Sequence, residues 1–134
     1  MQPVRIIALS GLALAILGLA NGLVMLTLPS FWYAETPGVA ETGPLNVHFI
    51  RDIGLAYLAA SLAMWFGIRR KDALLLALSA IFSAGHAATH LIDHGVGHGA
   101  HGVAAIAGEF IGIYLPAAIT LLLALIWINR PKEA

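Results

Sequence analysis

Cysteine is absent from this chain, and charged residues are scarce. Of the 134 residues, none is cysteine and only 10% are Asp, Glu, Lys or Arg, whereas soluble domains carry about a quarter of such residues. The lack of cysteine excludes disulfides, thiolate catalysis and thiolate metal ligands, and it is compatible with either redox compartment. The seven basic residues form no long run or stripe, so nothing in the sequence favours nucleic-acid binding.

Hydrophobic residues make up 60% of the chain, and the mean hydropathy is +0.88. The alternating pattern of a half-buried strand is nowhere visible. In lipid, only helices or closed barrels satisfy every backbone group. The sequence therefore predicts an all-α integral membrane protein whose first partner is the lipid bilayer.

Long apolar runs predict a single transmembrane domain over residues 1–134, folded as a four-helix bundle. The expected helices are about 6–28, 47–68, 73–94 and 103–128. Each can span a hydrocarbon core of about 30 Å, the second only if its polar first turns are included. The first run is longer than the roughly 7 to 15 residues of the apolar part of a signal peptide, so we interpret it as a retained helix.

Small residues and one proline predict local features of these helices. The first helix carries a flat stripe on which another helix can approach closely: Gly11, Ala15, Gly18 and Gly22. Gly108 and Gly112 predict a second close-packing face, on the fourth helix. Asn46 is a plausible N-cap of the second helix, and Pro116 predicts a kink or local opening of the fourth.

Basic residues predict the orientation of the bundle. They lie beside the first helix, between the second and third helices, and in the tail: Arg5, Arg69, Arg70, Lys71, Arg130 and Lys132. The other two loops carry acids and histidines. By the positive-inside rule, both termini are cytoplasmic. The first long loop and the histidine-rich loop then face the periplasm of a bacterial inner membrane.

Five of the six histidines lie between Gly85 and Gly102, in GHAATHLIDHGVGHGAHG. Four polar residues fall on the last turns of the third helix, at i, i+4, i+7 and i+8: His86, His90, Asp93 and His94. Histidines at i and i+4 can present two imidazoles to one ion from one helix face. The remaining histidines, His98 and His101, belong to a glycine-rich loop, where a simple polar loop and metal ligation are equally compatible with the sequence.

Two other helices carry ionisable residues at the same level. His48, Arg51 and Asp52 share one face in the outermost turns of the second helix, and Glu109 lies about two turns into the fourth. Ionisable residues within a membrane normally face the bundle interior and mark function. We therefore expect three helices to converge on one site in the outer-leaflet half of the bundle.

The order of these motifs resembles that of uncharacterised small four-helix bacterial inner-membrane proteins of the broad DoxX-like kind. The similar segments are NVHFIRDIGLAY, at the start of the second helix, and HAATHLIDH, at the end of the third. The resemblance covers most of the chain by topology and rests on few residues. It implies a four-helix inner-membrane bundle and no particular activity.

Our principal functional hypothesis is a metal site made of imidazoles and carboxylates, a ligand set that suits Zn, Fe, Mn or Cu(II). The candidate ligands, or partners that orient them, are His48, Asp52, His86, His90, Asp93, His94 and Glu109. Arg51 is unfavourable beside a metal and is expected to pair with Asp52 or Glu109, or to bind an anionic group. The hypothesis covers redox chemistry, metal handling and a structural metal, so enzymatic activity stays open.

Two alternatives are compatible with the same residues. The first is a b-type haem protein for electron transfer, with His48 and either His86 or His90 as axial ligands. The second is a non-catalytic accessory or packing subunit, in which the polar cluster only forms hydrogen bonds between helices. The chain would then act in a homo-oligomer or a larger membrane complex.

Overall fold

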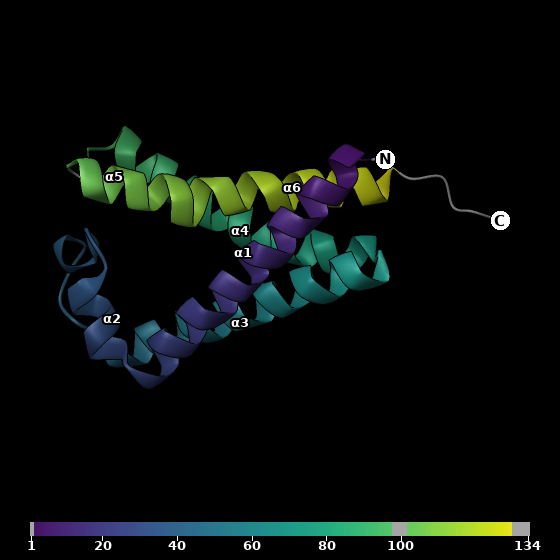
Figure 1. The fold of residues 1–134 in the computed structure, drawn as a ribbon. Coiled ribbons are helices and arrows are strands. Elements are labelled where there is room, and N and C mark those ends of the chain that lie inside the picture. Colours follow the sequence, from purple (N-terminus) through teal and green to yellow (C-terminus); the bar gives the residue numbers. More distant parts are fainter. Residues whose placement is uncertain (1, 98–101, 130–134) are drawn as a thin grey trace.

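The computed structural model describes residues 2–97 and 102–129, and the regular structure in these ranges is helical (Figure 1). Three long helices are α1 (Gln2–Thr27), α3 (Val47–Arg70) and α4 (Ala73–Gly95). A fourth rod is built from α5 (Val103–Glu109), a π-helical turn η2 (Phe110–Tyr114) and α6 (Leu115–Ile128). Between α1 and α3 lie the short helix α2 (Pro29–Glu35) and a 3-10 turn, η1 (Val39–Glu41).

Four segments are long and apolar enough to cross a membrane: Val4–Thr27, Val47–Arg70, Ala73–Gly95 and Val103–Ile128. The predicted all-α class with four candidate spans is confirmed. The observed bounds lie close to those expected from the apolar runs, and the segment α2 is an addition that the sequence interpretation did not contain.

Capping residues set the ends of α3 and α4. The Asn46 side chain accepts the N–H of Phe49 at 3.0 Å, which confirms the expected cap of α3. Asp72 caps α4 by accepting two backbone N–H groups of its first turn, at 2.9 and 3.2 Å. Lys71, which lies between α3 and α4, has a left-handed backbone conformation with φ 56°. Because this connection is so short, α3 and α4 pack side by side in opposite directions.

Glycines let α1 and α3 approach closely. A Cβ atom added at Gly22 would lie 2.7 Å from the carbonyl oxygen of Gly54, and one added at Gly54 would lie 3.0 Å from the carbonyl oxygen of Gly22. Gly18 faces the Ser61 hydroxyl in the same way. The small-residue stripe predicted on the first helix is therefore confirmed as a helix-packing face.

The fourth rod is locally widened before Pro116. The N–H of Leu115 bonds to the carbonyl oxygen of Phe110, five residues earlier, which is the hydrogen bond of a π turn. Pro116 has no N–H to continue the regular ladder. The predicted local opening is confirmed, and it lies on the N-terminal side of the proline, directly after Glu109.

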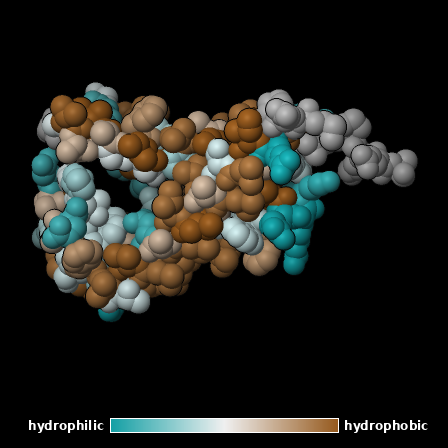
Figure 2. All heavy atoms as spheres, viewed as in Figure 1, coloured by the Kyte–Doolittle hydropathy of each residue, from teal (hydrophilic) through white to brown (hydrophobic). Residues whose placement is uncertain are grey.

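The buried core lies toward the end of the bundle that holds the connection between α3 and α4. Its residues come from all four rods: Ala15, Met64, Ile68, Leu76, Ala80, Leu123, Ala124 and Trp127. At this end α1 crosses α6, and toward the other end α1 and α2 diverge from α5 (Figure 1). Figure 2 shows a hollow between two arms, one formed by α1 and α2 and the other by α5.

Gly108 and Gly112 do not form the close-packing face expected from the sequence. A Cβ atom added at either position would meet nothing within 4 Å. Both residues are exposed, and both border the hollow. That prediction was wrong for this chain because the fourth rod leans away from α1 at this level.

Candidate functional site

A cavity of about 930 Å³ lies between the diverging arms. All four rods contribute to its wall, and so do residues of α2 and of the segment around η1. Apolar side chains form much of the lining, including Leu14, Leu17, Met25, Ile53 and Ile111. A volume of this size with a mostly apolar wall and a few polar groups is typical of a small-molecule site.

Helix α4 presents a polar stripe to this cavity. The lining residues on this stripe, three or four positions apart, are Ser79, Ser83, His86, His90 and Asp93. Because a helix turns once in 3.6 residues, this spacing places them on one face. The face runs from the second turn of α4 almost to its end.

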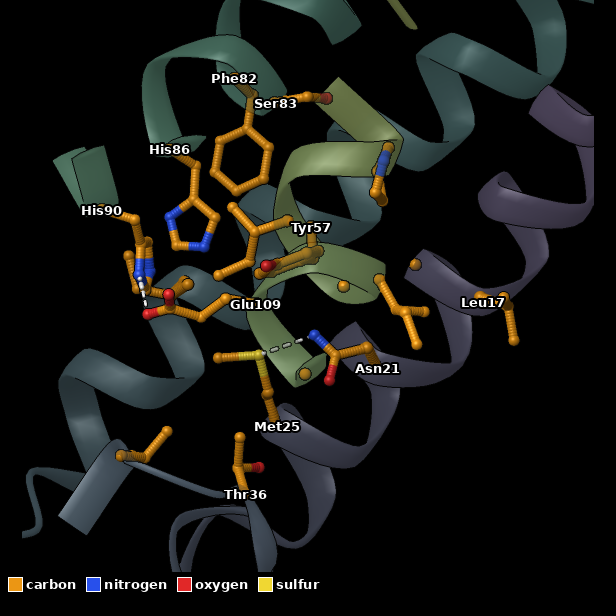
Figure 3. A pocket seen from close by; sticks show the side chains of 18 of the residues that line it. Leu17, Asn21, Met25, Thr36, Tyr57, Phe82, Ser83, His86, His90 and Glu109 are labelled. Carbon is orange, nitrogen blue, oxygen red and sulfur yellow. Dashed lines mark hydrogen bonds and ion pairs between the residues drawn. The ribbon is translucent and has the colours of Figure 1, made fainter. Parts of the chain in front are cut away.

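The strongest polar contact in the cavity joins α4 to α5. His90 Nδ1 lies 2.8 Å from Glu109 Oε1, and His94 Nε2 lies 2.6 Å from Glu109 Oε2. The Glu109 side chain is only 11% exposed, compared with 27% for His90 and 37% for His94. Figure 3 shows Glu109 and His90 meeting at the edge of the cavity. These contacts place the end of α4 against the second turn of α5.

These contacts define the proton positions when Glu109 is ionised. A carboxylate accepts hydrogen bonds at both oxygens, so His90 donates from Nδ1 and His94 donates from Nε2. In the neutral imidazoles, Nε2 of His90 and Nδ1 of His94 then carry lone pairs. The site therefore offers hydrogen-bond acceptors to a further molecule.

His86 lies one turn deeper, among aromatic rings. Its ring centroid is 4.9 Å from that of His90, 5.9 Å from Phe82 and 5.8 Å from Tyr57 on α3. The sequence interpretation did not single out Tyr57, although it is the one tyrosine within the second apolar run and shares the cavity wall with the histidines. Figure 3 shows these rings together.

Asn21 of α1 and Trp32 of α2 are two other lining residues outside the predicted site. The Asn21 Oδ1 atom accepts the indole N–H of Trp32 at 2.9 Å. The Asn21 amide also donates to the sulfur of Met25 at 3.5 Å. The bond between Trp32 and Asn21 holds α2 against α1, so the outer wall of the cavity is attached to a membrane-spanning helix. The sequence signal for this contact was a single asparagine, Asn21, within the first apolar run.

The polar residues at the start of α3 do not line the cavity. His48 and Asp52 form a pair on the surface, 3.5 Å apart, with side chains 90% and 56% exposed. Arg51 pairs with neither carboxylate in the described ranges and instead donates to the carbonyl oxygen of Leu26, near the end of α1, at 3.2 Å. The structure thus brings together His86, His90, His94 and Glu109 with the nearby Asp93, from two rods instead of three.

Within residues 2–97 and 102–129, the structure contains no preformed set of metal ligands. No group of three or more His, Asp or Glu side chains in that part of the chain is placed so that it could hold a metal ion. His90 and His94 both direct a ring nitrogen to Glu109 itself. The two loop histidines, His98 and His101, lie outside the described residues.

The helix lengths and hydropathy define a multi-pass membrane protein with four candidate spans. The histidine–carboxylate cluster lies in the half of the bundle away from the α3–α4 connection, and the cavity extends from this cluster to Met64 and Ser79. Comparison of the chain with protein-family models, curated proteins and solved structures finds no match. The four-span architecture implied by the resemblance is present, and no family assignment follows from these comparisons.

Proposed function

We propose that this protein binds a small amphipathic molecule in the cavity, with the polar head of that molecule at the His90–Glu109–His94 cluster. One observation carries the proposal: a largely buried carboxylate, held by two imidazoles, lies at the edge of a cavity of about 930 Å³. The apolar wall suits a hydrocarbon body, and the polar cluster suits a head group.

The hydrogen-bonding pattern favours a head group that donates a hydrogen bond. When Glu109 is ionised, the nitrogens of His90 and His94 that do not contact it are acceptors in the neutral rings. A hydroxyl group meets this requirement without a charge. A carboxylate head is disfavoured because a second negative charge beside Glu109 is costly in a medium of low dielectric constant.

A brominated alcohol tests the binding function directly, because bromine quenches tryptophan fluorescence on contact and Trp32 lines the cavity. In phosphatidylcholine vesicles, we expect a terminally brominated hexadecanol to quench the emission saturably, and Trp32→Phe to lose this component. His90→Ala should weaken the apparent affinity by about tenfold, the effect of losing roughly 1.4 kcal/mol.

His48→Ala is the matched control for His90→Ala, because His48 is exposed and does not line the cavity. It should leave the quenching curve unchanged. Equal weakening by both substitutions, or a linear and unsaturable curve for the wild type, would contradict the proposal.

A metal ion is the second candidate, and it is favoured by the convergence of two imidazoles on one carboxylate. In this form of the proposal, His90, His94 and Glu109 rearrange around Zn, Fe, Mn or Cu(II), with His86 and Asp93 nearby. Metal analysis of the detergent-purified protein tests it, and a stoichiometric metal is the expected result. In the haem alternative, the proposed axial ligand His48 lies exposed on the surface. An absorption spectrum without a Soret band would exclude a bound haem.

We further propose that both termini are cytoplasmic and that the cavity opens on the periplasmic side of a bacterial inner membrane. The basic residues at the α3–α4 connection support this orientation. Since the chain has no cysteine, single introduced cysteines report it without background. Ala40→Cys should react with a membrane-impermeant maleimide in intact spheroplasts, and Arg69→Cys only after lysis. The reverse pattern would overturn the orientation.

A further inference from the structure

The cavity has a lateral part, between α1 and the fourth rod, as well as an outer end. Its wall includes Leu14, Leu17 and Asn21 of α1 on one side and Gly108 and Ile111 of the fourth rod on the other. Helix α1 packs along α3 and against α6, whereas α5 and η2 belong to the rod that packs on α4. The two walls therefore diverge, and Figure 1 shows α1 running away from α5.

Two glycines lie bare at the edge of the fourth rod. A Cβ atom at Gly108 or Gly112 would meet nothing within 4 Å, and both residues line the cavity. A glycine inside a helix is less favourable than alanine by about 1 kcal/mol. Between α1 and α3 this cost accompanies close packing, but at Gly108 and Gly112 it accompanies open space instead. What these two residues provide is width at the opening.

The opening lies at the level of the hydrocarbon. Leu17 lies in the candidate span Val4–Thr27, and Gly112 lies in the candidate span Val103–Ile128. Exposed apolar side chains stand beside the gap on both walls, Leu17 on α1 and Ile111 on η2. A gap with such borders faces lipid chains, whereas the outer end of the cavity is walled in part by α2 and η1.

We propose that the gap between α1 and the glycines of the fourth rod is a lateral portal, through which a membrane-dissolved, long-chain amphiphile enters from the bilayer. Resting on the proposed binding function, this inference adds the source and class of the ligand. The molecule passes over Gly108 and Gly112 as it enters, its hydroxyl head then reaches His90 and Glu109, and its chain lies in the cavity that Trp32 lines.

Two probes that differ in length test the route. A terminally brominated hexadecanol resides in the bilayer, whereas a terminally brominated butanol arrives from water. We expect Gly112→Phe to slow the quenching of Trp32 by the hexadecanol about tenfold, equivalent to roughly 1.4 kcal/mol in a barrier. Quenching by the butanol should be unchanged. Gly108→Phe provides an independent variant with the same expected result.

Gly85→Phe is the matched control. Gly85 also has open space around its missing Cβ, but it does not line the cavity, so neither probe should be affected. Unchanged hexadecanol quenching in Gly112→Phe and Gly108→Phe, at wild-type melting temperatures, would overturn the portal and leave the binding function standing. Equal slowing of both probes would also overturn it. Failure of both probes to quench the wild type saturably would contradict the binding function itself.

The portal glycines could instead contact a second copy of the chain. In that case, Gly112→Phe would convert a wild-type dimer to a monomer without changing the quenching by either probe. That outcome would overturn the lateral portal and assign the glycines to a homo-oligomer.

Discussion

Replacement of Gly22 by alanine is expected to destabilise the bundle by about 2 to 3 kcal/mol, at the upper end of the usual cost of overpacking. The new Cβ would lie 2.7 Å from the carbonyl oxygen of Gly54 and about as close to the Leu58 side chain, at 3.0 Å. A carbonyl oxygen within a helix cannot rotate away, so α1 and α3 must separate. Reversible unfolding in mixed micelles, followed by circular dichroism, measures the loss.

Gly112→Ala is the control for this substitution. It adds the same methyl group to a helical glycine, but no atom lies within 4 Å of the new Cβ. We expect no loss of stability and a gain of as much as about 1 kcal/mol, because alanine is the better helix former. If Gly22→Ala and Gly112→Ala had equal effects, the close contact between α1 and α3 would not be the source of the stability.

The spans were predictable because apolar length is a local property of the sequence. A run of about 20 apolar residues spans a bilayer whatever its neighbours are, and the caps at Asn46 and the opening before Pro116 also depend on nearby residues only. Packing partners are not local. The small residues of α1 meet α3, whereas Gly108 and Gly112 meet nothing, and no feature of the two sequence patterns separates these outcomes.

The site was predictable in part for the same reason. Helical spacing places His86, His90 and His94 on or near one face of α4, and an ionisable residue in an apolar helix, such as Glu109, favours the interior. Spacing on α3 also places His48 and Asp52 together, and they do pair. This spacing does not indicate whether that face of α3 points toward the cavity or toward the surface. Near a helix end, exposed polar side chains can reach water, so the rule that they turn inward loses its force there.

The structure connects two features that the sequence patterns did not relate: the glycines that pack α1 on α3 and the polar cluster around Glu109. Close packing of α1 on α3, which depends on Gly22 and Gly54, holds α1 away from the fourth rod at the level of Glu109. The π turn directly after Glu109 widens that rod where the cavity begins. The same backbone features that set the helix positions thus create the space beside the polar cluster.

Substitution of Glu109 by leucine is expected to have the largest effect on binding. It removes the only carboxylate that contacts both His90 and His94 in the described structure, so the imidazoles lose their defined proton positions and their orientation. Hydrogen bonds to a charged group are worth about 1.5 to 3 kcal/mol. Loss of one such interaction in the bound state would weaken hexadecanol binding by about tenfold or more. The Trp32 quenching titration measures the change.

Asp52→Leu is the matched control, because it removes an exposed carboxylate that contacts a single histidine, His48, on α3. It should leave binding within the error of the wild type. Glu109→Gln keeps the shape of the side chain and one oxygen acceptor, so it should fall between the wild type and Glu109→Leu. A lower melting temperature for Glu109→Leu with unchanged probe binding would instead favour a purely structural cluster. Loss of a stoichiometric metal in the same variant would favour the metal site, since only that candidate requires Glu109 as a ligand.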